Sequence, residues 1–446
     1  MTAERRNSPR VRAVAVLRDV LERGARAAPT IVAQSAGLPP EDAALLRELV
    51  LGVLRWKSAL DGELSAVCRA PLSRLAPGLR EILEVALYQI RHLDRVPAYA
   101  AVDEAVRDAR RSGGAGAAGL VNAVLRNLSR ARPELGAGAD GDEGATAPAE
   151  LARRFSHPEF LVARWIDRLG LEATRRILAA DNAASPLDLM ANPVRTTRDE
   201  LSLALAREGI ETEPWPVSPL ALTVRAGNAL RSPLFAAGHF AIADLGSQTL
   251  PLLLPPGERL VDLAAAPGGK SFAAVLLGRA RSAVALDLSL SRLLLLVENR
   301  RRLGVAAVAA AASDVAAAPL PDGGSDRVLF DAPCSGTGTL RKNPEIRYRL
   351  TPEAIGRLAR AQREGLRSAA RLLAPGGYLL YATCSLEREE NEAVVEDVLD
   401  AEPSLGLAAI EPAPGLEPFV SGARFQMLPG PIHDGFTAHL LLRDPA

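Results

Sequence analysis

The stretch that decides the fold is RLVDLAAAPGGKS, residues 259–271. Its first part, Arg259–Leu263, is a short apolar run that predicts a buried strand. Gly268 and Gly269 follow, and because glycine has no side chain they allow the backbone to approach a ligand closely. The helix expected after them offers free amide N–H groups to an anion. The stretch therefore predicts a strand, a ligand-binding loop and a helix. Because its glycines lack the GxGxxG spacing of dinucleotide-binding loops, the ligand is expected to be something other than a dinucleotide.

Outward from this stretch, strands and helices alternate along the rest of the chain. This alternation predicts an α/β fold with a parallel sheet and helices on both of its faces. Ligands of such sheets bind beyond the carboxyl ends of the strands, so polar residues directly after each strand are the candidates for function. The expected strands are Arg259–Leu263, Ser282–Asp287, Ala306–Ala310, Arg327–Asp331 and Gly377–Thr383.

Composition divides the chain into four regions. Residues 1–132 show helical spacing throughout and predict an all-α bundle. Residues 133–150, rich in Gly, Ala, Pro and acid and free of basic residues, predict a linker. Residues 151–240 mix helices with short strands and predict a small α+β domain, and residues 241–446 form the α/β domain. The other elements expected are the helices Val11–Arg23, Pro40–Arg55, Leu79–Leu93, Ala98–Arg111, Gly119–Ser129, Pro158–Arg168, Leu171–Asp181 and Arg198–Glu208, and the strands Leu187–Asn192 and Ala221–Arg225.

Overall composition limits the class of protein. The length of 446 residues predicts two or three domains. Hydrophobic residues make up 48% and charged residues 24%, the profile of a soluble globular protein. No apolar run approaches the roughly 20 residues that span a membrane, and the polar N-terminus has no apolar segment of a secretory signal. We therefore expect a cytoplasmic protein that does not contact a membrane.

Basic residues are unevenly distributed although the net charge is zero. Residues 1–130 contain 20 Lys and Arg against 14 Asp and Glu, an excess that suits contact with phosphates and equally suits a solvated helical surface. A cluster of arginines lies at the start of this region: Arg5, Arg6, Arg10 and Arg12. Lysine is rare, and we expect it to persist where the ammonium group itself is needed. The three lysines are Lys57, Lys270 and Lys342.

Acidic residues follow the first three expected strands of the α/β domain. Asp262 lies at the end of the first, Asp287 ends the second and could bind ribose hydroxyls, and Asp314 follows the third and could accept from an adenine amino group. Each alone is more often a helix cap than a ligand. Together with the glycine loop, the three acids favour a nucleoside cofactor.

Two cysteines also fall at the expected ligand-binding edge. Cys334 follows the fourth strand in DAPCSGTGTLRKNP, residues 331–344, and Cys384 follows the fifth in YATCS, residues 381–385. Two thiols without a nearby pair of His make a poor zinc site, and the spacing is not that of a CxxC redox pair. A thiolate nucleophile beside a cofactor remains. Cys68, within the helical region, is expected to be a buried small apolar residue.

Longer motifs around these cysteines resemble those of the RNA cytosine-C5 methyltransferases of the RsmB/NOP/Sun superfamily. The motifs are APGGKS (266–271), DAPCSGTGTLRKNPE (331–345) and YATCSLEREENEAVV (381–395). Residues 79–105 and 119–128 look like the NusB-type helical domain of RsmB proteins, and residues 233–248 and 428–441 also follow the family. The resemblance covers nearly the whole chain except the linker.

This resemblance implies a role for each motif residue. Cys384 is expected to be the nucleophile that attacks the cytosine ring, and Cys334 to assist product release. Asp331 and Lys270 are expected to hold the base and to balance charge as it develops in the ring. The residues expected to bind the cofactor, S-adenosylmethionine, are Ala264, Ala265, Ala266, Pro267, Gly268, Gly269, Lys270, Asp287, Asp314 and Asp331.

The resemblance further implies a substrate, because RsmB proteins are the members that join a NusB-like domain to this catalytic domain. We expect a monomer without a metal that modifies 16S ribosomal RNA in a single-stranded or loop region, where the base can be unstacked. The aromatic content of 4% is low for a protein that stacks bases, so arginine and phosphate contacts are expected to contribute more. Ala264 replaces a cysteine that is frequent in RsmB proteins, and Ala243, Leu245 and Gly246 replace polar or acidic residues.

Other functions remain open from the sequence. The same chemistry could act on transfer RNA or on another ribosomal cytosine. A non-catalytic RNA-binding assembly or antitermination factor is suggested by the helical region, but it does not account for the filled cofactor positions. Methylation of an exocyclic amine is excluded because the fourth strand leads into DAPC rather than into an Asp/Asn-Pro-Pro-aromatic turn.

Overall fold

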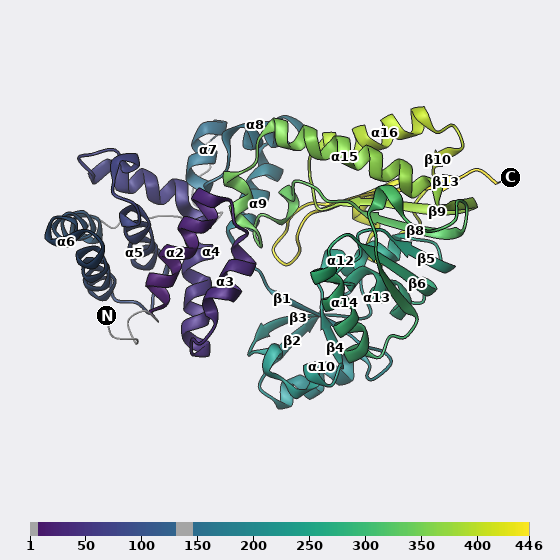
Figure 1. Cartoon of the computed structure of the whole chain (residues 1–446), viewed down its shortest axis with the longest axis horizontal. Coiled ribbons are helices and arrows are strands. Elements are labelled where there is room, and N and C mark those ends of the chain that lie inside the picture. The colour runs from purple at the N-terminus through teal and green to yellow at the C-terminus, as the bar shows by residue number, and fades with distance from the viewer. Residues whose placement is uncertain (1–7, 131–145, 446) are drawn as a thin grey trace. The chain divides into compact units, whose positions relative to one another are not determined.

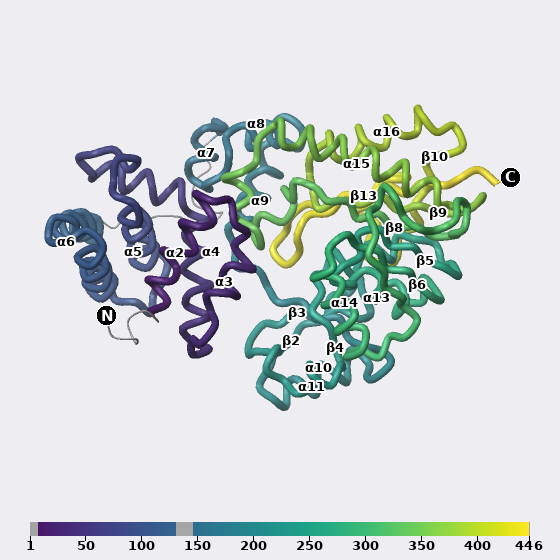
Figure 2. The backbone as a smooth tube through the Cα atoms, viewed as in Figure 1, coloured from purple at the N-terminus to yellow at the C-terminus, as the bar shows by residue number. Residues whose placement is uncertain are grey.

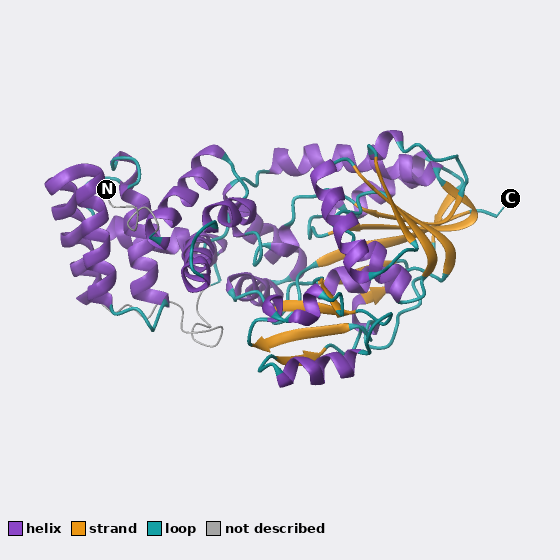
Figure 3. Cartoon of the chain, turned by 60° about the horizontal axis from the view of Figure 1, so that its bottom comes forward, coloured by secondary structure: helices purple, strands orange, loops and turns teal. Residues whose placement is uncertain are grey.

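The computed structural model describes residues 8–130 and 146–445, which form two compact units (Figure 1). The helical unit comprises Met1–Ala183 together with Leu340–Leu350. The sheet unit comprises Ala184–Thr339 and Thr351–Ala446. Within the described residues, every strand belongs to the sheet unit (Figure 3).

The helical unit is built around a core of aliphatic side chains. The apolar stretch from Leu79 to Leu93 forms α5, with Leu83 and Leu87 fully buried against Leu54 and Leu125 of neighbouring helices. The helices are α2 (Pro9–Arg23), α3 (Ala27–Ser35), α4 (Pro40–Val67), α5 (Leu79–His92), α6 (Ala98–Arg130), α7 (Pro148–Phe155), α8 (Glu159–Leu169) and α9 (Leu171–Asn182), with short 3-10 turns η1 (Leu72–Arg74) and η6 (Pro344–Tyr348).

Two helices of this unit extend beyond the expected bounds. Helix α4 continues to Val67 because Leu60 and Leu64 prolong its buried face. The two helices expected at 98–111 and 119–129 are both present; they share the label α6 and meet at a kink at Gly114, whose backbone is non-helical. Of the expected linker, residues 133–145 lie outside the described residues, as do Arg5 and Arg6, and α7 begins at Pro148.

The sheet unit contains a small antiparallel sheet ordered β2-β3-β1-β4, drawn in teal in Figure 2. Helix α10 packs on it through Leu201 and Leu205, and begins at a capping box in which Thr197 and Glu200 bond reciprocally. Only β1 and β3 were expected from the sequence, because β2 and β4 are too short to show a pattern. The elements are β1 (Leu187–Ala191), α10 (Arg198–Arg207), β2 (Glu211–Pro214), β3 (Ala221–Ala226), η2 (Ala229–Arg231), α11 (Pro233–Ala236) and β4 (Phe240–Ile242).

The larger sheet has nine strands in the order β11-β12-β13-β9-β8-β5-β6-β7, with β10 paired to β13. Strands β7, β6, β5, β8 and β9 are parallel, and β13 runs antiparallel to β9. The strands are β5 (Gly257–Asp262), β6 (Ala280–Asp287), β7 (Val308–Ala312), β8 (Ser325–Asp331), β9 (Leu373–Thr383), β10 (Leu405–Leu407), β11 (Val420–Ser421), β12 (Arg424–Met427) and β13 (Phe436–Arg443).

Helices cover both faces of this sheet, as the alternation of strands and helices predicts. Leu329 of β8 faces the core that includes α13 and α14, whereas its neighbours Val328 and Phe330 face the core of α15 and α16. The helical elements are α12 (Leu245–Thr249), η3 (Leu250–Leu253), α13 (Gly269–Leu276), α14 (Leu290–Leu303), η4 (Val315–Ala317), η5 (Thr337–Thr339), α15 (Pro352–Arg371), η7 (Arg388–Glu390), α16 (Glu392–Ala401) and η8 (Glu417–Phe419).

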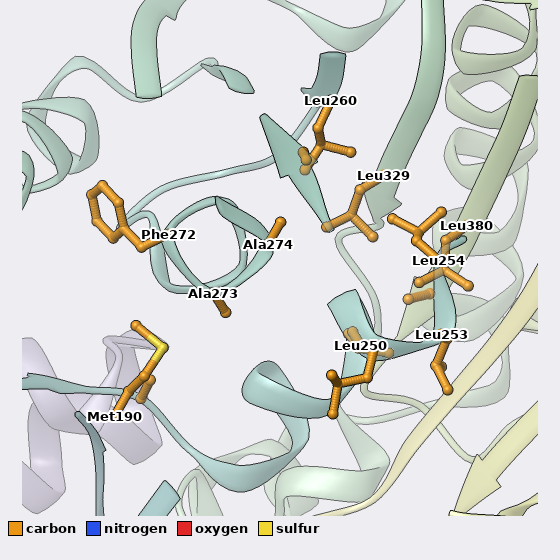
Figure 4. Packing of buried hydrophobic residues seen from close by; sticks show 14 of the residues in the cluster. Met190, Leu250, Leu253, Leu254, Leu260, Phe272, Ala273, Ala274, Leu329 and Leu380 are labelled. Atoms are coloured by element: carbon orange, nitrogen blue, oxygen red, sulfur yellow. The ribbon is translucent and has the colours of Figure 1, made fainter. Parts of the chain in front are cut away.

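The topological switch point lies at β5, since the chain continues from β5 to β6 and β7 on one side and then crosses back to β8 on the other. Ligands of open α/β sheets bind at such a point. Figure 4 shows the core beneath it, in which side chains of three adjacent strands meet helix α13, the turn η3 and strand β1 of the small sheet. The labelled residues are Leu260, Leu329, Leu380, Phe272, Ala273, Ala274, Leu250, Leu253, Leu254 and Met190. The two sheets therefore share one core, which fixes the edge where the candidates lie.

Candidate active site

The candidate residues gather at the carboxyl ends of four parallel strands. Asp262 ends β5, Asp287 ends β6 and Asp331 ends β8. Strand β9 ends at Thr383, directly before Cys384. The strand register places these ends at one edge of the sheet, as the sequence predicts.

The glycine loop, residues 264–270, keeps its shape through its own backbone. Gly268 has a φ of 104°, and a Cβ there would lie 2.5 Å from the ring of Phe272. The amide of Ala265 donates to the carbonyl of Leu286 at 2.9 Å, and the amide of Gly268 to the carbonyl of Ala265 at 2.7 Å. A Cβ built on Gly269, the first residue of α13, would meet nothing closer than Ala243, at 3.8 Å. This open backbone at a helix start fits the carboxylate of an amino-acid-bearing cofactor.

Asp287 is buried with 1% of its surface exposed, and its carboxylate is already hydrogen-bonded. It accepts from the amides of Ala266 (3.1 Å) and Ser289 (2.8 Å) and from the guanidinium of Arg292 (2.6 and 2.8 Å). Sequence reasoning missed Arg292, for which the only signal was a basic residue one helical turn after the acid. Asp314 is exposed and accepts from the amide of Ala316 at 2.9 Å, which is the cap role considered above.

Lys270 and Asp331 form an ion pair of 2.6 Å between the glycine loop and β8. Burial alone would lower the pKa of Lys270, but the carboxylates of Asp331 and Asp262 outweigh it and the net shift is upward, so the ammonium stays charged. Burial raises the pKa of Asp262 to about 6, against the hydrogen bond of 2.6 Å that it accepts from Ser271. The loop therefore presents a fixed positive charge at the sheet edge.

The two motif cysteines are in contact, with 3.2 Å between the Sγ atoms, and both are free thiols. The pKa of Cys334 is raised well above its ordinary value, first by the hydrogen bond with Cys384, then by burial and by the charge of an ionised Cys384. Two thiolates at this separation repel each other strongly, so the pair loses one proton far more readily than two. The upward shift of its pKa favours the thiol form of Cys334.

Backbone contacts fix the position of Cys384. Its carbonyl accepts from the amide of Gly338 at 2.9 Å, and the carbonyl of Gly338 accepts from Gly435 at 2.7 Å. A Cβ on Gly338 would lie 2.5 Å from the carbonyl oxygen of Gly435. The loop after β8, the loop after β9 and the segment before β13 are thus packed backbone against backbone.

Further residues at this edge were not expected from the sequence. Ser335 and Ser385, each directly after a cysteine, have their hydroxyl oxygens 3.1 Å apart, and both bond to the buried carboxylate of Glu390. Nothing distinguishes Glu390 in the run EREEN, where consecutive acids suggest a solvated surface. Cys68 directly follows α4 as its C-cap residue and packs against the helical core, but it is half-buried rather than buried as expected.

In the part of the chain that the structure describes, no group of three His, Cys, Asp or Glu is arranged to hold a metal. None of the described helices is both long enough and apolar enough to cross a lipid bilayer.

Comparison with known proteins places three families along the chain. The NusB family matches residues 7–130, a ferredoxin-like domain of RsmF/B-like methyltransferases matches 157–231, and the family described as 16S rRNA methyltransferase RsmB/F matches 250–441. A probable ribosomal RNA small subunit methyltransferase B of Bacillus subtilis is 35% identical over 89% of this chain and 90% of its own. The chain belongs to the RsmB/F family of rRNA methyltransferases.

A second relative agrees with this RsmB/F membership, and a solved structure shares the fold. Ribosomal RNA small subunit methyltransferase B of Vibrio cholerae is 33% identical over 96% of this chain and 95% of its own. The crystal structure of PH0851 has the same fold, with a TM-score of 0.77 at 24% identity over 97% of this chain and 98% of that one.

Membership in the RsmB/F family confirms the family resemblance and the fold class expected from the sequence, with a NusB-type helical part, a small α+β part and an α/β methyltransferase part. The protein is an S-adenosylmethionine-dependent rRNA methyltransferase, as the cofactor prediction states.

Proposed function

We propose that this protein transfers a methyl group from S-adenosylmethionine to carbon 5 of a cytosine in 16S ribosomal RNA, with Cys384 as the nucleophile. The observation that carries the proposal is the contact of 3.2 Å between Cys334 and Cys384 at the ligand-binding edge. Carbon 5 of cytosine is a poor nucleophile until a thiolate adds to carbon 6, so this reaction needs a positioned thiol that the methylation of an amine does not.

In the proposed reaction the Cys384 thiolate forms a bond to C6, and the ring becomes an enamine whose C5 is nucleophilic. S-adenosylmethionine, when bound, would supply an electrophilic methyl group: its bond to the sulfonium sulfur would break as the bond to C5 forms, leaving S-adenosylhomocysteine. A base then takes the proton from C5, the C5–C6 double bond re-forms and the S–C6 bond breaks. Cys384 leaves as a thiolate, ready for another cycle.

Cys334 is suited to the last step because it keeps its proton and lies in hydrogen-bond contact with Cys384. A thiol that donates to the departing sulfur stabilises the thiolate as it forms. This asymmetry, attack by Cys384 and assistance by Cys334, agrees with the roles that the family resemblance implies.

Lys270 and Asp331 are proposed to contact the cytosine ring. The Lys270 ammonium can stabilise negative charge that develops when the thiolate adds, and the Asp331 carboxylate can accept from the amino group of the base. The proposed cofactor site comprises Ala264, Ala265, Ala266, Pro267, Gly268, Gly269, Lys270, Asp287, Asp314 and Asp331. For ribose to reach the Asp287 carboxylate, Arg292 has to share or release it.

The choice of 16S rRNA is supported by the relatives from Bacillus subtilis and Vibrio cholerae, whose names specify the ribosomal small subunit. We propose a single-stranded or loop target and a monomeric enzyme. Two arginines of the N-terminal cluster form hydrogen bonds within the helical unit. Arg10 donates to the side chain of Gln89 at 2.8 Å, and Arg12 donates to the carbonyl of Ala36 at 2.9 Å. They contribute less to RNA binding than their charge suggests.

The nucleophile is tested by Cys384→Ala. This variant is expected to lose methyl transfer to 16S rRNA from labelled cofactor while still binding S-adenosylmethionine in a calorimeter, because none of the glycine-loop residues is changed. Retained turnover would show that Cys384 is not the nucleophile.

The release role is tested by Cys334→Ala. The variant is expected to trap the Cys384–cytosine bond, giving an RNA–protein adduct that survives denaturing electrophoresis. The double variant that also carries Cys384→Ala is the control and should form none. Absence of the adduct from the single variant, with normal protein folding, would contradict the role of Cys334.

The substrate is tested by bisulfite sequencing of 16S rRNA and transfer RNA from a strain that lacks the gene. One cytosine of 16S rRNA is expected to lose its protection and to regain it when the gene is restored. Loss in a transfer RNA instead would reassign the substrate but keep the chemistry, and no loss in any RNA would favour a non-catalytic factor.

A further inference from the structure

A buried carboxylate lies between the two cysteine loops. Glu390, the last residue of η7, has no exposed surface. It accepts from the amide of Ser335 at 2.8 Å and from the Nε2 of Gln362 at 3.0 Å through one oxygen. Its other oxygen accepts from the hydroxyls of Ser335 and Ser385, the latter at 2.6 Å.

The partners of Glu390 are the immediate neighbours of the two sulfurs. Ser335 follows Cys334 in the loop after β8, and Ser385 follows Cys384 in the loop after β9. One side chain therefore bonds to both loops at the residue next to each thiol.

An ionised carboxylate suits this position because it only accepts hydrogen bonds, so both serine hydroxyls have to direct their protons at it. Burying such a charge is unfavourable unless hydrogen-bond donors compensate it, and here four donors do. Two of these four donors, the backbone N–H of Ser335 and the Nε2 of Gln362, cannot act as acceptors. The arrangement is thus satisfied only when both loops are in place around Glu390.

We propose that Glu390 is a positioning residue that holds the Cys334 and Cys384 thiols in contact by bonding to Ser335 and Ser385. It touches neither sulfur and acts through the two loops. The catalytic consequence rests on the proposed function of the cysteines, whereas the positioning itself does not.

The kinetic test compares Glu390→Ala and Glu390→Gln with the control Glu396→Ala. Glu396 lies on α16, 57% exposed, and pairs with Arg388 at the surface. Loss of all four bonds in Glu390→Ala is expected to lower kcat about 100-fold, the usual cost of misplacing reacting groups by about 1 Å. The KM for S-adenosylmethionine should change less than about twofold, because no partner of Glu390 is on the glycine loop.

Glu390→Gln should recover most of the rate, to within about tenfold of the unmodified protein. Its amide oxygen can still accept from the Ser335 and Gln362 donors, and its NH2 group can donate to the serine hydroxyls, which can rotate. Equal losses in Glu390→Gln and Glu390→Ala would contradict positioning by hydrogen bonds.

The separation of the thiols is measured independently of methyl transfer. In the full chain carrying Cys68→Ser, the disulfide-forming reagent diamide oxidises two thiols to a disulfide and is itself reduced to the hydrazine. Rapid closure of a Cys334–Cys384 disulfide, followed by peptide mass spectrometry, is expected, and Glu390→Ala should slow it at least about tenfold. Closure at an unchanged rate in a folded Glu390→Ala protein would overturn the proposal, whatever the effect on activity.

If Glu390→Ala does not fold by circular dichroism, Ser385→Ala replaces it. That variant removes one donor and should slow disulfide closure by about threefold to tenfold, and an unchanged rate would again overturn the proposal. Failure of the proposed function is distinguished from failure of this inference. A protein without methyl transfer to any RNA, in which Glu390→Ala still slows disulfide closure, would contradict the first and support the second.

Discussion

At the scale of single residues, lysine is informative because it is so rare in this chain. Lys57 lies 2.5 Å from Glu84 in the helical core, and Lys270 lies 2.6 Å from Asp331 at the sheet edge. Arg292 lies equally close to Asp287, at 2.6 Å, so distance alone does not distinguish the two residue types, but an ammonium is compact whereas a guanidinium is planar and larger. Two of the three lysines thus pair with a carboxylate, and a need for the ammonium group itself stays a prediction.

Lys270→Arg tests this point directly. It keeps the charge but displaces it from Asp331, so we expect kcat for rRNA methylation to fall at least about tenfold, and further, about 100-fold, in Lys270→Met. Single-turnover methylation with saturating cofactor measures the effect. A Lys270→Arg enzyme with normal kcat would show that charge alone is sufficient.

Gly268 is a residue whose backbone conformation excludes a side chain. Alanine there has to adopt a φ of 104° and meets the Phe272 ring at 2.5 Å, whereas at Gly278, with a φ of 68°, a Cβ meets nothing within 4 Å. We expect Gly268→Ala to abolish measurable S-adenosylmethionine binding and to destabilise the protein by about 2 to 4 kcal/mol. Gly278→Ala should cost about 1 kcal/mol and bind normally. Calorimetry and urea unfolding of both variants separate the clash from the backbone strain.

The sequence predicts the two cysteines and the strand-end acids but not the residues that hold them. Motif position and turn formers place Cys334 and Cys384 at the edge, since the ends of parallel strands have to meet there. Glu390 is different, because its burial depends on two loops distant in sequence from each other. Arg292 likewise looks like an ordinary surface residue until the Asp287 carboxylate is found beside it.

At the scale of elements, apolar periodicity predicts those helices and buried strands whose pattern is contained in a single stretch of sequence. All five expected parallel strands are present, but β7 begins two residues later than expected, at Val308. The run of alanines from 306 to 312, broken only at Val308, gives no pattern that could fix its register. The antiparallel strands β10 to β13 were not expected, since they are short or depend on pairing with β9 and with one another.

The packing of three loops around Gly338 leads to a prediction at this scale. Gly338→Ala places a Cβ 2.5 Å from a carbonyl oxygen of Gly435, backbone that cannot move aside cheaply. We expect the Cys334 loop to shift and kcat to fall about 100-fold, with cofactor affinity nearly unchanged.

The control for this prediction is Gly356→Ala in α15, where a Cβ meets nothing within 4 Å. It should keep full activity and gain about 0.5 to 1 kcal/mol of stability from helix propensity. Equal activity of the two variants would show that the loop contact is not needed.

At the scale of the whole molecule, the chain enters the helical unit twice. Residues 340–350 leave the sheet unit directly after the Cys334 loop and belong to the helical unit, where Arg347 is 3% exposed. Its guanidinium donates to the carbonyls of Arg55 (3.0 Å) and Asp181 (3.0 Å) and to the Oδ1 of Asn182 (2.8 Å). No local pattern in RKNPEIRY (residues 341–348) predicts the burial of Arg347, because its hydrogen-bond partners lie about 165 residues or more away in sequence.

Arg347→Ala is expected to destabilise the helical unit by about 3 to 5 kcal/mol, because several buried carbonyls lose their donor. Arg349→Ala, in the same segment but exposed, should cost less than about 1 kcal/mol. Urea unfolding followed by helical circular dichroism compares the two. Similar midpoints would mean that the buried arginine is not needed for stability.

Buried histidines predict acid sensitivity of both units. Burial lowers the pKa of His439 in β13 to about 4, and burial, then the charge of Arg347, lowers that of His157 in the helical unit. The unfolded chain binds protons to these rings at about pH 6.5 while the folded protein does not, so stability falls as the pH drops from about 6.5 towards 4. His439→Gln should flatten this dependence by up to about 3 kcal/mol, as measured by urea unfolding at pH 4.5 and 7. An unchanged slope would indicate that His439 is protonated in the folded state.

The second passage of the chain through the helical unit restricts how this protein can be divided or recombined. A chimera joined only at residues 183 and 184 would combine one relative's N-terminal helices with another's residues 340–350, leaving Arg347 to meet acceptors it did not evolve with. Deleting the N-terminal helices would leave residues 340–350 without their hydrogen-bond partners. The helical unit is therefore complete only when the eleven residues 340–350, encoded far downstream, are matched to its N-terminal helices.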